Sequence, residues 1–150
     1  KICKKKYDII FYYKKNNNKS NKFFKNLIKL LLKDHIKIVI IGDDIEIKNI
    51  NLKNFINLDR NKAKKIISQS KCGINSIENL YSFFTLDCLS NNLIVFYNGA
   101  LPQSKNLKTN LLIKYDYNNL CKSYNIIKNK LNKKVNPKIF IRKLYFRDYL

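Results

Sequence analysis

The stretch IKIVIIGDD, residues 36–44, gives the strongest indication of the fold of this chain. From Ile36 to Gly42 it is almost continuously apolar and rich in β-branched side chains, which is typical of a strand covered on both faces. Strands of that kind belong to parallel sheets that carry helices on both sides. The stretch therefore predicts a buried strand of a parallel sheet that ends at a glycine and two aspartates.

The residues before this strand complete one strand–helix–strand unit. YDIIFYY, residues 7–13, is a β-branched and aromatic run that predicts a first strand. Between residues 20 and 34, apolar side chains recur at helical spacing with lysines on the opposite face. Ser20 is in position to cap this helix. The chain thus opens with the repeating element of an α/β fold.

The unit repeats along the rest of the chain. Further strands are predicted at 55–58, 72–75, 93–98 and 110–116, and further helices after Asp59, within 76–92, over 120–131 and from Pro137 onward. Strand and helix alternate almost without exception. We therefore predict the α/β class, with a doubly wound, mostly parallel, six-stranded Rossmann-like sheet and helices on both faces. Residues 1–150 are expected to form a single domain.

The formal net charge of +21 favours acidic partners in general. Lysines are spread over nearly every segment and only three arginines are present, whereas nucleic-acid-binding proteins usually cluster their basic residues and use arginine. Lys, Asn and Ile are abundant together while alanine is rare, which is typical of an A- and T-rich coding sequence. We therefore expect no nucleic-acid partner. A basic module that binds nucleic acid or an anionic membrane stays open as an alternative, because KIFIRKLYFRDYL, residues 138–150, mixes apolar, aromatic and basic residues as interfacial helices do.

The apolar runs, the targeting signals and the cysteines of the sequence indicate where in the cell the protein is located. No apolar run reaches the roughly 20 residues that span a bilayer, and no signal peptide is recognised. The four cysteines are scattered without the close spacing of a zinc or redox site, so we expect reduced, mostly buried thiols. These features predict a cytoplasmic protein, with peripheral contact at the inner membrane face as a further option. Because the sequence begins at Lys1 without a methionine, we expect a fragment of a longer protein.

Polar residues follow the predicted strands at one edge of the sheet. In an open α/β sheet, ligands bind outside the carboxyl ends of the strands, where helix N-termini also attract phosphate. The residues that fall there are Lys14, Lys15, Gly42, Arg60 and Ser76. No GxGxxG follows the first strand and no GxxxxGK[ST] is present, so the usual NAD and ATP motifs are missing. The pattern predicts a diphosphate ligand held by other means.

One carboxylate lies where the sequence is otherwise apolar. SIENLYSFFTLDCLSNN, residues 76–92, predicts a helix buried on most faces, yet Asp87 lies in the middle of it. A buried and unpaired carboxylate is very costly. Asp87 is therefore satisfied by a protein cation or a helix cap, or it meets a ligand.

Five segments in this order resemble the C-terminal, donor-binding half of a GT-B glycosyltransferase that uses a nucleotide sugar. They are YDIIFYYKK, IKIVIIGDD, FINLDRNKAKKIISQSKCGI, SIENLYSFFTLDCLSNNLIVF and TNLLIKYDYNNL, and together they cover roughly residues 7–132. The most specific part is residues 76–92, which resembles the two-glutamate motif of that family. The motif has an acid in the loop before a helix and a second acid inside the helix.

The resemblance implies a role for each matching residue. Asp87 would hydrogen-bond the ribose hydroxyls, and Glu78 would be the catalytic acid near the transferred sugar. The backbone N–H groups of Tyr81, Ser82 and Phe83 would face the diphosphate, and Lys14 or Lys15 would neutralise it. Arg60, together with Asn57 and Leu58, would lie near the base. Gly42 and Ser76 complete the predicted ligand-binding set.

The chain departs from the family pattern at several positions. Glu78 and Asp87 are one position further apart than the two acids of the family, and Asn79 stands at the family spacing. Asn79 is thus an alternative for the first position, which would place an amide there. The second acid is shortened to aspartate, Ser82 replaces a glycine, and no Gly-Arg pair follows the first strand.

The implied activity is metal-independent transfer of a sugar from a nucleotide diphosphate sugar to an acceptor hydroxyl. Asp43 and Asp44 are adjacent and form no Asp-x-Asp metal motif, and no cofactor beyond the donor substrate is implied. The acceptor, a glycan or a lipid-linked glycan, and the general base would belong to an N-terminal domain that this chain lacks, so the fragment alone is expected to be inactive. A non-catalytic α/β interaction domain is a second alternative.

Overall fold

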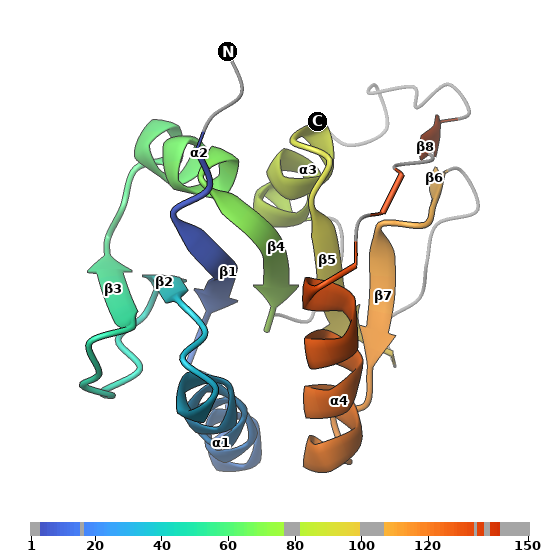
Figure 1. Cartoon of the computed structure of the whole chain (residues 1–150). Helices are drawn as coiled ribbons and strands as arrows, with labels where there is room; N and C mark the ends of the chain where they lie inside the picture. The colour runs from blue at the N-terminus through green and yellow to red at the C-terminus, as the bar shows by residue number, and fades with distance from the viewer. Residues whose placement is uncertain are drawn as a thin grey trace.

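Six strands form a parallel sheet in the part of the chain that the structure describes (Figure 1). The structure is a computed structural model, and it describes residues 4–15, 17–76, 82–99, 107–133, 135–136 and 139–141. The spatial order of the strands is β3 (Leu52–Ile56), β2 (Ile38–Gly42), β1 (Tyr7–Tyr13), β4 (Ser70–Asn75), β5 (Ile94–Asn98) and β7 (Leu112–Tyr115). Every neighbouring pair is parallel. This order confirms the predicted doubly wound, Rossmann-like class.

The central strands are buried because their sequences are apolar on both faces. In β1, Ile9, Ile10 and Phe11 are all fully buried, and in β2 the same is true of Val39 and Ile40. Consecutive residues of a strand point to opposite faces, so a run of buried neighbours requires cover on both sides. The sheet thus forms the middle layer of three.

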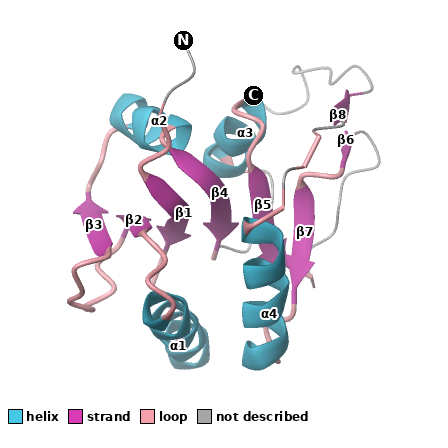
Figure 2. Cartoon of the chain, viewed as in Figure 1, coloured by secondary structure: helices cyan, strands magenta, loops and turns pink. Residues whose placement is uncertain are grey.

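Four helices cover the sheet within the described residues (Figure 2). Helices α1 (Asn18–Lys33) and α4 (Leu120–Leu131) pack against each other, and so do α2 (Arg60–Ser68) and α3 (Phe83–Ser90). The order of strands reverses direction after β1, so right-handed crossovers place these two pairs on opposite faces. The predicted helices on both faces are therefore present.

A small second sheet corrects one sequence-based prediction. The strands β6 (Leu107–Thr109) and β8 (Ile139–Ile141) pair in antiparallel fashion. A helix was predicted from Pro137 onward, but residues 139–141 are extended because β6 offers them a backbone partner. Residue 138 and residues 142–150 of the proposed interfacial segment lie outside the described residues. None of the described helices has the length and the apolar run that a membrane crossing requires.

The starts of α1 and β3 also differ from the sequence-based prediction. Helix α1 is capped by Asn17, whose side chain accepts a hydrogen bond from the Ser20 backbone N–H at 2.9 Å, so the predicted cap at Ser20 is wrong. The third strand begins at Leu52, earlier than predicted. The predicted cap of α2 is confirmed, because the Asp59 side chain accepts from the Lys62 N–H at 3.0 Å.

The three cysteines within the described residues are free thiols, as expected from their spacing. Cys72 and Cys88 are buried, and this burial raises the pKa of both thiols. Cys121 is exposed on α4, and Cys3 lies outside the described residues. The buried pair therefore behaves as apolar core rather than as reactive groups.

Candidate functional site

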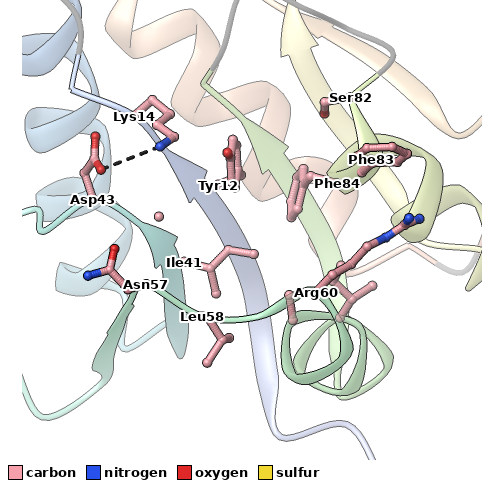
Figure 3. Close-up of a pocket in the computed structure, with 13 residues that line it drawn as sticks. Tyr12, Lys14, Ile41, Asp43, Asn57, Leu58, Arg60, Ser82, Phe83 and Phe84 are labelled. Carbon is pink, nitrogen blue, oxygen red and sulfur yellow. Dashed lines mark ion pairs between the residues drawn. The ribbon is translucent and has the colours of Figure 1, made fainter. Parts of the chain in front are cut away.

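A pocket of about 550 Å³ opens at the carboxyl ends of β1 and β2 (Figure 3). Its remaining walls come from the segment between β3 and α2, from α2 itself and from the first turn of α3. The lining polar and charged residues are Lys14, Asp43, Asn57, Arg60 and Ser82, and the apolar and aromatic ones include Tyr12, Ile41, Leu58, Phe83 and Phe84. The pocket lies next to the boundary between β1 and β4, where the strand order reverses. Ligands of open α/β sheets bind at this kind of position.

Gly42 shapes the wall of the pocket at the end of β2. Its φ angle is +110°, a conformation that residues with a side chain rarely adopt. A Cβ atom at this position would lie 2.2 Å from the Tyr13 carbonyl oxygen. The close approach also lets the Asp43 N–H donate to that carbonyl at 2.9 Å. The glycine therefore allows the chain after β2 to fold against the end of β1.

The structure separates the two lysines that follow β1. The Lys14 ammonium lies 3.8 Å from Asp43 Oδ1, with the two side chains 48% and 37% exposed, and Lys14 lines the pocket (Figure 3). The Lys15 ammonium instead donates to Glu46 Oε1 at 2.9 Å, and this hydrogen bond raises the pKa of Lys15. Lys15 is absent from the pocket lining. Lys14 is thus the lysine that faces the pocket.

Ser76 ties the ends of β1 and β4 together. Its hydroxyl donates to the Tyr12 carbonyl at 2.6 Å and accepts from the Lys14 N–H at 3.2 Å. The side chain is buried and is absent from the pocket lining. These contacts fix the backbone from which Lys14 projects, so the hydroxyl serves the structure of the strand ends.

The first turn of α3 points its N-terminus at the pocket. Ser82 is the N-cap and accepts from the Thr85 N–H at 3.4 Å, and Phe83 and Phe84 are the first two helical residues. Thr85 is itself held by the buried Asn75 side chain, whose amide donates to the hydroxyl at 3.0 Å. The first turn contains no acidic residue. The free N–H groups and the positive end of the helix dipole can therefore attract an anion.

Asp87 forms a two-point ion pair with Arg60. Arg60 Nε donates to Asp87 Oδ2 at 3.2 Å, and Nη2 donates to Oδ1 at 3.1 Å. The Asp87 side chain is 11% exposed, whereas Arg60 is 49% exposed. The hydrogen bond to Asp87 raises the pKa of Arg60. The buried carboxylate is thus satisfied by a protein cation, one of the alternatives that the sequence left open.

Arg60 also contacts the aromatic ring at the start of α3. Its guanidinium carbon lies 4.2 Å from the centre of the Phe83 ring, and Phe83 is 68% exposed (Figure 3). Of the ion pair, Arg60 lines the pocket and Asp87 does not. The cation is therefore the member that a ligand can reach.

Three residues of the predicted site, Glu78, Asn79 and Tyr81, lie outside the described residues. Of the others, the structure brings Lys14, Gly42, Arg60, Ser82 and Phe83 together around the pocket. Sequence reasoning missed Tyr12, whose ring stacks on Phe84 with centroids 5.4 Å apart. The alternation of side chains along β1 could have identified Tyr12. Tyr13 is buried on the side of α1, and consecutive residues of a strand face opposite sides, so Tyr12 faces the side of the pocket.

Comparison with solved structures identifies the fold of this chain. No family model and no curated protein sequence matches the chain. The UDP-GlcNAc 2-epimerase of Methanocaldococcus jannaschii, in complex with UDP-GlcNAc and UDP, matches with a TM-score of 0.68 and 11% identity, over 91% of this chain and 41% of that one. The E. coli heptosyltransferase WaaC with ADP-2-deoxy-2-fluoro heptose matches with a TM-score of 0.56 and 12% identity, over 85% and 43%. WaaC with ADP gives 0.54 and 12%, over 82% and 42%.

These similar structures define the class of fold. They are GT-B enzymes, and the chain matches one domain of them. It spans about two-fifths of the length of the solved structures that it matches. The chain therefore has the architecture of one GT-B domain. This confirms the expected fold resemblance.

Proposed function

We propose that this chain binds a nucleotide diphosphate sugar in the pocket at the ends of β1 and β2. One observation carries the proposal: a cationic side chain, Lys14, and the N-terminus of α3 line a single pocket of about 550 Å³ beside the strand-order reversal. A diphosphate is the ligand group that both features favour. The fold is shared with enzymes whose structures hold UDP-GlcNAc or an ADP-heptose analogue.

The reaction that we propose is sugar transfer from that donor to an acceptor hydroxyl, without a metal. In such a transfer, negative charge develops on the departing diphosphate. In this proposal, Lys14 and the N–H groups of Phe83 and Phe84 stabilise this charge, which is supported by the position of all three residues in the pocket lining. Lys14 only has to leave a long and exposed ion pair with Asp43, at 3.8 Å, to reach the ligand.

The remaining chemistry of the transfer is assigned to groups outside the described residues. Glu78, or Asn79 in its place, is the proposed group next to the transferred sugar. The general base and the acceptor, a glycan or a lipid-linked glycan, are assigned to a second domain, because the chain spans about two-fifths of the enzymes that share its fold. We therefore expect the chain alone to bind the donor without turnover.

Titration calorimetry with UDP, GDP, ADP and their sugar conjugates tests this proposal. We expect one nucleotide diphosphate to bind, and Lys14→Ala to weaken its binding by about tenfold to a hundredfold, the loss of one charge-assisted hydrogen bond. Lys15→Ala is the matched control, because its ammonium is held by Glu46 away from the pocket, and it should leave the affinity unchanged.

Two results would contradict the proposal. In the first, no nucleotide diphosphate binds to the wild-type chain. In the second, the two lysine variants weaken binding equally, which would assign the effect to general charge instead of to the pocket. Thermal unfolding of each variant verifies that the comparison is made between folded proteins.

A further inference from the structure

Three contacts fix the position of Arg60 at the edge of the pocket. The Asp59 cap sets the start of α2, where Arg60 is the first helical residue. Asp87 accepts two hydrogen bonds along one edge of the guanidinium. The Phe83 ring covers the guanidinium at 4.2 Å. A long side chain that would otherwise sample many rotamers is thus held in one orientation before any ligand arrives.

The same contacts leave part of the guanidinium available. An arginine carries five N–H donors and no acceptor. One from Nε and one from Nη2 are donated to Asp87, and the other three have no partner among the described residues. The Arg60 side chain is 49% exposed and lines the pocket. A ligand at this end of the pocket therefore meets hydrogen-bond donors.

The Asp87 carboxylate, in contrast, is nearly buried and already has protein partners. Its side chain is 11% exposed, both of its oxygens accept from Arg60, and the Lys64 ammonium lies 3.9 Å from Oδ1. It is absent from the pocket lining. Direct contact with ribose hydroxyls would require the ligand to reach a carboxylate that is nearly buried, already paired with Arg60 and outside the pocket lining.

We propose that Arg60 is the residue that contacts the nucleoside, by donating to one of its acceptor oxygens, and that Asp87 is a positioning residue that acts only through Arg60. This inference rests on the proposed function and assigns the two residues different roles within it. Figure 3 shows Lys14 and Arg60 on opposite sides of the pocket, as expected if the first meets the diphosphate and the second the nucleoside. The acceptor oxygen is a carbonyl of uracil or guanine, or an oxygen of the ribose.

A double-mutant cycle on nucleotide binding tests the division of roles. The affinities of UDP, GDP and ADP are measured for the wild-type chain, Arg60→Ala, Asp87→Asn and the double variant. We expect Arg60→Ala to weaken binding by about tenfold to a hundredfold. Asp87→Asn should weaken binding in the wild-type background and have no further effect once Arg60 is alanine. A purely structural role of Asp87 would not produce this dependence on Arg60.

Further variants keep the test decisive if Arg60→Ala folds poorly. Arg60→Lys retains the charge but loses the planar two-point geometry, and it should also weaken binding. Lys64→Ala is the matched control, since this lysine is near Asp87 but is absent from the pocket lining, and binding should be unchanged. Near-ultraviolet circular dichroism establishes that each variant is folded.

The pattern across nucleotides distinguishes the two acceptor oxygens. A larger loss for UDP and GDP than for ADP assigns the contact to a base carbonyl, because adenine has none, and an equal loss assigns it to the ribose. If Asp87→Asn weakens binding by the same factor with and without Arg60, Asp87 contacts the ligand directly and the inference is overturned. If the wild-type chain binds no nucleotide, the proposed function is overturned and the inference with it.

Discussion

At the residue scale, Gly42 is a position where the backbone tolerates no side chain. Its φ is +110°, and a Cβ atom there would lie only 2.2 Å from the Tyr13 carbonyl oxygen. We expect Gly42→Ala to lower the free energy of unfolding by roughly 3 kcal/mol or more, because strain and a clash add. Chemical denaturation monitored by circular dichroism measures this change.

Gly99→Ala is the control for that substitution. A Cβ atom there would lie 3.2 Å from the Tyr115 carbonyl oxygen, a tight contact that a small shift relieves, and its backbone shows no positive φ. We expect a clearly smaller loss of stability. Equal losses in the two variants would show that the chain after β2 can rearrange, and the described geometry of the pocket wall would then be wrong.

Individual residues also show which features of the candidate site the sequence could not predict. The sequence predicted that Lys14, Lys15, Arg60 and Asp87 belong to one edge of the sheet, because each follows a strand or lies in the helix that begins there. It could not decide between the lysines, since their directions depend on Asp43 and Glu46 in another loop. The pairing of Asp87 with Arg60 joins residues of two helices, and no local pattern reveals such a contact.

At the element scale, α1 and α4 are joined by a polar contact at one end. Asp34, the C-cap of α1, accepts hydrogen bonds from the Tyr124 hydroxyl and from the Lys128 ammonium of α4, the latter at 3.0 Å. The bond from Tyr124, followed by that from Lys128, lowers the pKa of Asp34. The ionised carboxylate thus holds together two helices that are distant in the sequence.

This contact gives a stability change with a defined direction in pH. A carboxyl whose pKa is lowered by folding stabilises the folded state above its unfolded pKa of about 3.9, and this contribution is lost as the pH falls through the folded pKa. We expect Asp34→Asn to have a lower melting temperature than the wild type near pH 7. The difference should shrink as the pH falls below about 4. Melting curves between neutral and acidic pH measure it.

Asp44→Asn is the comparison for this experiment. Asp44 lies in the loop after β2, where its side chain accepts from the Glu46 N–H, and it joins no two helices of the described part of the chain. Its substitution should leave the difference between neutral and acidic stability nearly as in the wild type. A gap between Asp34→Asn and the wild type that stays constant down to acidic pH would contradict an ionised contact.

Elements differ in how well the sequence predicts them. The central strands β1 and β2 and the helix α1 were predicted because their own residues carry the periodicity, continuous in the strands and helical in α1. The start of β3 and the strand β8 were not. Both are short or lie at an edge, and their extended conformation comes from backbone pairing with β2 and β6 rather than from their side chains.

At the scale of the whole molecule, the net charge of +21 attracts every anion, whereas the proposed site is selective for a nucleotide diphosphate. We expect single-stranded DNA to bind weakly at low salt and to lose affinity steeply as salt rises, because many diffuse lysines displace many counterions. A nucleotide diphosphate should lose less, since few cations contact it. Fluorescence anisotropy with labelled DNA, beside calorimetry with the nucleotide, compares the two salt dependences.

Lys14→Ala separates the two effects in the same protein. It removes one charge among many, so DNA binding should change little, while nucleotide binding falls. DNA binding that persists at high salt would instead favour a dedicated nucleic-acid surface over the nucleotide-sugar site.

The placement of β1 in the middle of the sheet also sets the order in which the molecule can be assembled. During synthesis the amino-terminal residues emerge first, and β1 finds β2 quickly because α1 alone separates them. Its other neighbour, β4, is complete only at Asn75, so one side of the central strand stays unpaired until half of the chain exists. The early half supplies Lys14 and Gly42, and the later half supplies α3. The pocket is therefore formed by parts of the chain that are synthesised at different times, and it is complete only when those parts have packed together.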